Sequence, residues 1–244
     1  MAPYQATIAY DGTDFFGFQR QKNEITIQSE IENALRKIGW TEKSILTAGR
    51  TDTGVHAEGQ VIKFELDWHH KNIDLMRALN SKLPLTISVK NVKIAEEGFH
   101  PRFSAKERWY RYQVVFLPDR NPFFERYYWR VWPKPDKLLL MAGAQKISGT
   151  HDFYTLGRSP LKGGSTVRTV ISSDWQFAGK NEAIFRIKAG SFLYHMVRRT
   201  VFLLMLVGLG KLDAVDLEKN IIEKKELPPG IAPANGLFLE KVVY

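Results

Sequence analysis

The chain has 244 residues, which is enough for one large domain or two modest ones. It contains no cysteine, which excludes disulfides, thiolate nucleophiles and thiolate metal sites, including the zinc site of the nucleobase deaminases. With 35 Lys and Arg against 26 Asp and Glu, its formal charge is +9, a balance that favours a polyanionic partner such as a nucleic acid or an anionic membrane surface.

In the first part of the chain, apolar periodicity predicts alternating strands and helices. Apolar residues recur at helical spacing from Ile27 to Ile38, and Gly39 ends that pattern. The predicted elements are strand 5–10, helix 26–38, strands 43–48 and 59–66, helix 73–81 and strand 88–95.

The second part repeats this order approximately. Its predicted elements are strands 109–116 and 127–131, helix 137–147, a hairpin of strands 167–177 and 183–189, helix 193–209, a short helix 213–220 and strand 237–243. The mixture predicts an α+β fold with mainly antiparallel strands and helices on one face of the sheet. We divide the chain into an N-terminal domain, 1–102, and a C-terminal domain, 103–244, although strand pairing across this boundary would make one continuous sheet.

No segment predicts insertion into a membrane or export. The longest apolar run, residues 201–209, is less than half of the about 20 residues that a membrane span requires. The N-terminus lacks the cationic lead and apolar core of a signal peptide. We therefore expect a cytoplasmic protein.

The most informative segment runs from Gly49 to Ala57 and reads Gly-Arg-Thr-Asp-Thr-Gly-Val-His-Ala. It lies between two apolar strand patterns, and its glycines supply the backbone freedom of a tight loop. Such a loop presents the carboxylate of Asp52 on a rigid scaffold. Taken alone, Asp52 is better explained by a turn in which it hydrogen-bonds its own backbone, and we expect His56 to be structural.

Cationic residues cluster in three further places, and in one of them they alternate with aromatic residues. The clusters are Lys106, Arg108 and Arg111 among Trp109, Tyr110 and Tyr112; Arg198 with Arg199; and Arg158, Lys162 and Arg168 around a glycine-rich stretch. Cations beside aromatic rings are typical of RNA-binding surfaces, where they pair with phosphates and stack on bases. A charge that serves solubility alone is the alternative.

Two other readings of these motifs are weaker. Asp52-Thr53-Gly54 matches the signature of aspartic proteases, but those need two carboxylates that share a proton, and a second copy would come only from a homodimer. The stretch from Lys162 to Thr166 lacks the residue order of a phosphate-binding P-loop, and the histidines show no metal-ligand spacing. We predict neither a metal nor a cofactor.

The segment from Gly49 to Ala57 resembles the active-site loop of the TruA-type tRNA pseudouridine synthases. Further motifs of that family follow in the same order along the whole chain: Tyr10-Asp11-Gly12, Gly17 to Gln21, Thr26-Ile27-Gln28, Phe99 to Ala105, Tyr110-Arg111-Tyr112, His151-Asp152-Phe153, Met196-Val197-Arg198 and Pro233 to Leu237. The departures are mild: Thr53 stands where the family usually has alanine, Phe18 where it often has tryptophan, and Arg199-Thr200 where a different polar pair is usual. Arg199 would add a phosphate contact.

The resemblance implies isomerisation of uridine in tRNA, with Asp52 as the essential carboxylate. Asp52 either attacks the sugar carbon or takes a proton from the sugar, and the sequence leaves both roles open. By the same resemblance, Arg198 pairs with Asp52 and keeps it ionised, and Tyr110 lies against the uracil and serves in the final proton removal. Arg50 enters the space left by the flipped nucleotide, and Leu237 lines the floor of the pocket.

The resemblance also implies two similar α+β halves around a continuous, mainly antiparallel sheet, with an RNA-binding cleft between them. It implies a homodimer that holds one tRNA and modifies uridines on the 3′ side of the anticodon stem-loop. We place Arg108, Arg111 and Lys162 on the path of the tRNA. A non-catalytic RNA-binding protein on the same scaffold is the alternative function.

Overall fold

A computed structural model describes residues 1–159 and 163–244, which form two compact units. The first unit comprises Met1–Lys106 and Phe238–Tyr244, and the second comprises Glu107–Leu237. The predicted division at 102/103 differs from this one chiefly at the C-terminus. The last strand returns to the first unit, because it pairs with a strand there, and periodicity in the sequence does not reveal a strand's partner.

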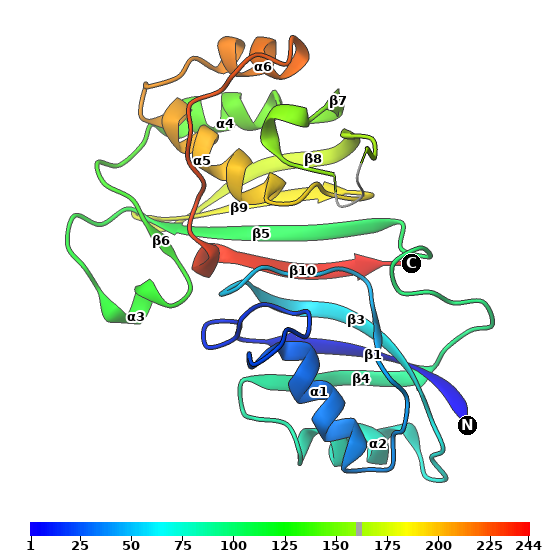
Figure 1. The fold of residues 1–244 in the computed structure, drawn as a ribbon. Helices are drawn as coiled ribbons and strands as arrows, with labels where there is room; N and C mark the ends of the chain where they lie inside the picture. The colour runs from blue at the N-terminus through cyan, green and yellow to red at the C-terminus, as the bar shows by residue number, and fades with distance from the viewer. Residues whose placement is uncertain (160–162) are drawn as a thin grey trace. The chain divides into compact units, whose positions relative to one another are not determined.

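The first unit is built on five of the described strands (Figure 1). They follow the order β4 (Ile87–Ile94), β1 (Ala2–Tyr10), β3 (His56–Leu66) and β10 (Leu237–Val243), with the short β2 (Leu46–Thr47) also paired to β3. β1 runs antiparallel to both β3 and β4, whereas β10 runs parallel to β3. The start of β3, which follows directly on the Asp52 loop, therefore lies between two neighbouring strands.

The helices of the first unit are α1 (Ile27–Arg36) and α2 (Asn72–Asn80). α1 begins at a capping box, in which the Thr26 hydroxyl accepts a hydrogen bond from the Ser29 amide and the Ser29 hydroxyl accepts one from the Thr26 amide. Ile27, Ile31 and Leu35 recur at helical spacing and are buried. The cap and the apolar stripe together fix where the helix starts and which side faces the core.

The second unit is also built on five described strands (Figure 1). They follow the order β5 (Glu107–Val115), β9 (Glu182–Ala189), β8 (Val167–Ala178) and β7 (Gly149–Asp152), all antiparallel, with β6 (Trp129–Arg130) parallel to β5. Its helices are α3 (Pro122–Glu125), α4 (Lys137–Gln145), α5 (Met196–Gly208) and α6 (Ala214–Ile222).

The sheet of the second unit has one buried and one polar face. Register places Tyr112, Phe185 and Trp175 side by side on the buried face, with at most 6% of each residue exposed. α4 packs against this face, where the Lys137 ammonium lies 4.9 Å from the ring of Phe177. α5 in turn packs against α4.

The predicted α+β fold with mainly antiparallel strands is confirmed. The predicted strand 43–48 is much shorter, because Arg20 and Glu32 bind the backbone of Lys43 and Ile45. The predicted helix 193–209 begins only at Met196, and β7 and α3 were not predicted. Among the described residues, no helix is both long and apolar enough to cross a membrane.

Candidate active site

The loop that carries Asp52 is fixed at its start by the strands on either side. The amide of Ala48 donates to the carbonyl of Val61, which continues the pairing of β2 with β3. The carbonyl of Gly49 accepts hydrogen bonds from the Thr47 hydroxyl, at 3.0 Å, and from the side-chain amide of Gln60, at 2.8 Å. Gln60 is fully buried, so this anchor is held inside the first unit.

The N-terminal segment packs directly on the middle of the loop. The Phe18 amide donates to the carbonyl of Thr51 at 3.0 Å, and the Tyr10 hydroxyl lies 2.8 Å from the Thr51 hydroxyl. Gly17 approaches so closely that a Cβ there would lie 3.0 Å from the Thr51 carbonyl oxygen, and its φ of +81° is also unfavourable for a side chain. The backbone at Asp52 is thus set by residues more than 30 positions away.

A second contact fixes the end of the loop. The Gly12 amide donates to Nδ1 of His56 at 3.0 Å, and a Cβ on Gly12 would lie only 2.0 Å from the carbonyl oxygen of Val55. His56 is fully buried and stacks on Phe238, with 4.6 Å between ring centroids. These contacts support the expectation that His56 has a structural role.

A buried charge network lies behind the loop. Glu32 has no exposed surface, and its carboxylate accepts from a guanidinium nitrogen of Arg20 at 2.6 Å. The same carboxylate accepts from the side chain of Gln28 at 2.8 Å and from the backbone amide of Ile45 at 3.2 Å. The network ties the N-terminal segment, α1 and the chain entering the loop to one buried charge, a role for Arg20 that the sequence patterns did not predict.

The loop leaves its reactive groups accessible in spite of these anchors. Asp52 is partly exposed and Arg50 is exposed, whereas Thr51, Val55 and His56 are buried. A turn closed by the bond from the Val55 amide to the Asp52 carbonyl, at 3.1 Å, carries Gly54 at a φ of +77°. A carboxylate on such a fixed, partly open turn can act on a bound substrate.

In the second unit, Arg198 and Arg199 lie in the first turn of α5 and hold a loop. Nε of Arg198 donates to the carbonyl of Ala232 at 2.8 Å, and the guanidinium of Arg199 donates to the carbonyls of Gly230 and Leu227. Burial lowers the pKa of Arg199 from its ordinary value, but an arginine stays cationic at any physiological pH. The expected phosphate contact of Arg199 is therefore not favoured, since its donors already bind carbonyls.

Tyr110 and Tyr112 share one face of β5 but differ in environment. Tyr110 is partly exposed, and its ring meets Phe192 edge-on with 5.1 Å between centroids. Tyr112 is fully buried, and its hydroxyl donates to the carbonyl of Pro233 at 2.7 Å. Burial raises the pKa of Tyr112 far above its ordinary value, while the nearby charge of Arg198 opposes the shift. Of the two phenols, only Tyr110 is open to a substrate.

Two of the predicted RNA-binding cations, Arg108 and Arg111, lie on opposite faces of β5. Arg108 shares the face of Tyr110 and donates to the carbonyl of Gly190, whereas Arg111 lies on the opposite face of β5 beside Gln113. Lys162 falls outside the described residues. Leu237, the first residue of β10, is buried with 6% exposure, in the manner of a core residue.

A comparison with protein families decides the relationship of this chain to known proteins. The family model described as tRNA pseudouridine synthase matches residues 6–104 and 144–244. The chain belongs to this family. Membership makes it an isomerase that acts on tRNA. The two matched segments leave out part of the second unit, including Tyr110, Arg108 and Arg111.

Curated relatives support the same family over the full length. The chain is 38% identical to the tRNA pseudouridine synthase A of Thermodesulfovibrio yellowstonii, with 100% of both chains covered. It is 37% identical to that of Latilactobacillus sakei, with 99% of this chain and 98% of the relative covered, and 37% identical to that of Dictyoglomus thermophilum, with both chains covered completely. The matches include the region between the two segments of the family model.

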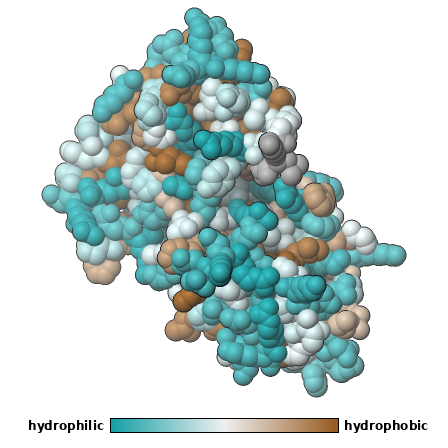
Figure 2. All heavy atoms as spheres, viewed as in Figure 1, coloured by the Kyte–Doolittle hydropathy of each residue, from teal (hydrophilic) through white to brown (hydrophobic). Residues whose placement is uncertain are grey.

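Within residues 1–159 and 163–244, no three His, Asp or Glu side chains are grouped so that they could hold a metal ion. On the face shown in Figure 2, hydrophilic residues cover most of the surface and hydrophobic residues occur in small separate groups.

Proposed function

We propose that this protein isomerises uridine to pseudouridine on the 3′ side of the anticodon stem-loop of tRNA, that it acts in the cytoplasm as a homodimer, and that Asp52 is its essential carboxylate. The observation that carries the proposal is the Asp52 loop, whose motif matches the family and whose backbone is anchored at Gly49, Thr51 and His56. Such anchoring holds one carboxylate in a fixed place while leaving it partly open.

The reaction breaks the N–C glycosidic bond, turns the uracil over and forms a C–C bond to the same sugar. In one route, the ionised carboxylate of Asp52 attacks the sugar carbon and stabilises its oxocarbenium character, as carboxylates do in glycosidases. In the other, the same carboxylate takes a proton from the sugar in an elimination. Both routes need Asp52 ionised at the start.

Arg198 is proposed as the cation that pairs with Asp52. A guanidinium opposite a carboxylate favours its ionised form and fixes its rotamer. The bond from Nε of Arg198 to the Ala232 carbonyl supports this role, because it restricts the position of the guanidinium. Arg199, whose guanidinium spans two carbonyls, is the structural neighbour.

Tyr110 is proposed to lie against the uracil ring and to take part in removing the proton from carbon five after the new bond has formed. Its partial exposure supports this role, whereas burial and the bond to Pro233 exclude Tyr112 from contact with substrate. Arg50, exposed on the loop, would fill the space left by the flipped nucleotide, and Leu237 would line the pocket floor. Arg108, Arg111 and Lys162 remain candidates for phosphate contacts.

The proposal is tested by mapping modified uridines in unmodified tRNA after incubation with the wild type, with Asp52→Asn or with Asp67→Asn. Asp67 is a matched control, since it is an exposed carboxylate of the same unit. We expect new pseudouridine in the anticodon arm with the wild type and the control, and none with Asp52→Asn. Binding of tRNA by the wild type without any new pseudouridine would favour the alternative, a non-catalytic RNA-binding protein.

A further inference from the structure

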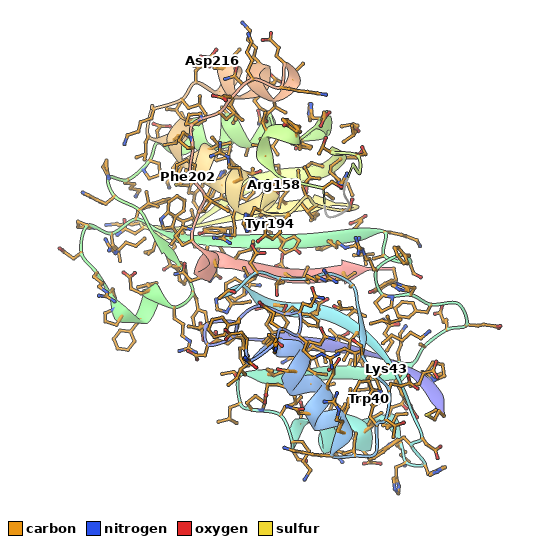
Figure 3. The ribbon with its side chains drawn as sticks, viewed as in Figure 1. Trp40, Lys43, Arg158, Tyr194, Phe202 and Asp216 are labelled. Atoms are coloured by element: carbon orange, nitrogen blue, oxygen red, sulfur yellow. The ribbon has the colours of Figure 1, made fainter. Side chains whose placement is uncertain are left out.

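A short pairing outside the named strands brings Arg158 and Tyr194 together just before α5. The Tyr194 amide donates to the carbonyl of Arg158 at 2.9 Å, and the Arg158 amide donates to the carbonyl of Tyr194 at 3.4 Å. Residues that exchange both bonds across an antiparallel pair project their side chains to the same side. Figure 3 labels the two side chains, which come from neighbouring segments of the second unit.

Close packing of the two backbones holds this pairing rigidly. A Cβ on Gly157 would lie 2.6 Å from the carbonyl oxygen of Tyr194 and 2.8 Å from Cβ of Leu193, so the two backbones meet without room for a side chain. Leu156 and Leu193 on either side are buried. The positions of Arg158 and Tyr194 are therefore fixed by the core, although both side chains are exposed.

Tyr194 presents an aromatic surface that the protein does not cover. Tyr194 is 54% exposed, and its ring stacks on that of His195 with 3.7 Å between the ring centroids and 26° between the ring planes. His195 has a φ of +66°, a left-handed backbone conformation that is strained for a non-glycine residue and that concentrates at functional sites. This backbone turn is what places the two successive rings against each other.

The chemistry beside this ring is cationic. Arg158 is exposed, and within the part of the chain that the structure describes neither its guanidinium nor the Tyr194 hydroxyl has a hydrogen-bond or ion-pair partner. An exposed aromatic ring next to a cation with uncommitted donors is the pair of groups that proteins use for unpaired nucleotides, with stacking on the base and a charge on the phosphate.

We propose that Tyr194, backed by His195, stacks on an unpaired base of the bound RNA and that Arg158 binds the adjoining phosphate. We call these three residues the stacking site. The inference rests on the proposed function in taking tRNA as the RNA. In the proposed function, Arg198 lies at the target uridine. Because His195 lies three residues before Arg198, at the N-cap of α5, the stacked base would be a neighbour of the target uridine rather than the target itself.

The test compares Tyr194→Leu with Tyr194→Phe in equilibrium binding of an unmodified tRNA transcript and in steady-state isomerisation. Loss of one stacked base weakens binding by about 5- to 150-fold. We expect Tyr194→Leu to raise Kd and KM within that range with kcat little changed. Tyr194→Phe keeps the ring and should bind like the wild type. Equal Kd values for Tyr194→Leu and the wild type would overturn the stacking site. An equal loss of tRNA affinity in Tyr194→Leu and Tyr194→Phe would also overturn it, provided that both variants unfold at the same temperature as the wild type.

The phosphate contact is tested separately through the salt dependence of binding. Removing one contact lowers the slope of log K against log salt concentration by about 0.7 to 0.9. We expect this for Arg158→Gln and not for Arg77→Gln, a matched control on the first unit with a 73% exposed side chain. A slope for Arg158→Gln equal to that of the control would remove Arg158 from the site.

The outcomes separate the stacking site from the proposed function. If the wild type forms pseudouridine and Tyr194→Leu has an unchanged Kd and KM, the stacking site is wrong and the function stands. If the wild type binds tRNA without isomerising it and Tyr194→Leu still binds more weakly, the function is wrong and the stacking site stands. A wild type that binds no tRNA contradicts both.

Discussion

The Asp52 loop of the first unit and the start of α5 in the second unit hold their functional groups by different means. Around Asp52, the main chain is anchored by residues far away in sequence, and the Asp52 side chain is partly exposed. At α5 and β5, each proposed functional side chain has a similar neighbour that is committed to structure: Arg198 beside Arg199, and Tyr110 near Tyr112. The first arrangement fixes a position through the backbone, whereas the second divides function and structure between two like residues.

The largest test of this contrast is the pair Tyr110→Phe and Tyr112→Phe. If the Tyr110 hydroxyl transfers a proton, its removal should lower kcat by about 100-fold or more, whereas Tyr112→Phe should cost about 1 kcal/mol of stability with kcat nearly unchanged. Steady-state kinetics and chemical denaturation measure the two effects. A larger kcat loss in Tyr112→Phe would reverse the assignment.

Tyr112 also predicts a dependence on pH. Because burial raises the pKa of Tyr112 above that of an unfolded tyrosine, its contribution to stability is fully present below about pH 10 and is lost as the pH rises further. The wild type should therefore lose stability between neutral and strongly alkaline pH more steeply than Tyr112→Phe. Parallel curves for the two proteins would contradict the buried, neutral state of this phenol.

The second comparison is Arg198→Met against Arg199→Met. If Arg198 pairs with Asp52 as proposed, Arg198→Met should lower kcat roughly 100-fold or more. Arg199→Met leaves two carbonyls without their charged donor, so we expect a loss of about 1.5 to 3 kcal/mol in stability but kcat within a few-fold of the wild type. Similar kcat values in the two folded variants would show that Arg198 and Arg199 do not divide function and structure between them.

The third comparison tests the backbone anchors of the loop with two glycines. Gly12→Ala would place a Cβ 2.0 Å from the Val55 carbonyl oxygen, so the loop must shift, and a shift of about 1 Å can cost 100-fold in rate. A Cβ on Gly49 meets nothing within 4 Å, which makes Gly49→Ala the matched control. We expect kcat to fall only in Gly12→Ala; full activity in that variant would mean that the anchor at His56 does not position Asp52.

The smallest expected effect on rate concerns the buried charge network around Glu32, where we expect a loss of stability instead. Arg20→Met leaves the buried carboxylate of Glu32 without its nearest cation and should cost about 2 to 3 kcal/mol in the free energy of unfolding, less than the loss of a fully buried pair because the Arg20 side chain is 46% exposed. Arg77→Met breaks an exposed pair with Asp74 and should cost under about 1 kcal/mol. Equal losses of unfolding free energy in Arg20→Met and Arg77→Met would show that the burial of Glu32 does not strengthen its pairing with Arg20.

Local elements of the fold were predictable where the chain itself carries the signal. The strand 237–243 and the hairpin of 167–189 match the structure closely, because alternation and the turn at Gly179-Lys180-Asn181 are local features. The predicted start of α5 was wrong, because Tyr194 pairs with Arg158 and the helix begins only at Met196. The partner of β10 was likewise invisible in the sequence, since pairing is set by the whole sheet.

The candidate site was predictable only in part for the same reason. The motif singled out Asp52, and the family resemblance singled out Arg198 and Tyr110. The contacts that hold the loop join residues 41 and 44 positions apart, and nothing in a single sequence marks the Gly12 amide as the partner of His56. Exposure separates Tyr110 from Tyr112, and it depends on what packs against β5 rather than on either residue type.

The most direct test of the central claim is release of tritium from carbon five of labelled uridine in tRNA, measured for the wild type and for Asp52→Asn at equal tRNA binding. The account predicts release with the wild type and none above background with the variant, because replacing the carboxylate with an amide removes the group that acts on the sugar while the anchored loop stays in place. Release by Asp52→Asn at the wild-type rate would contradict it.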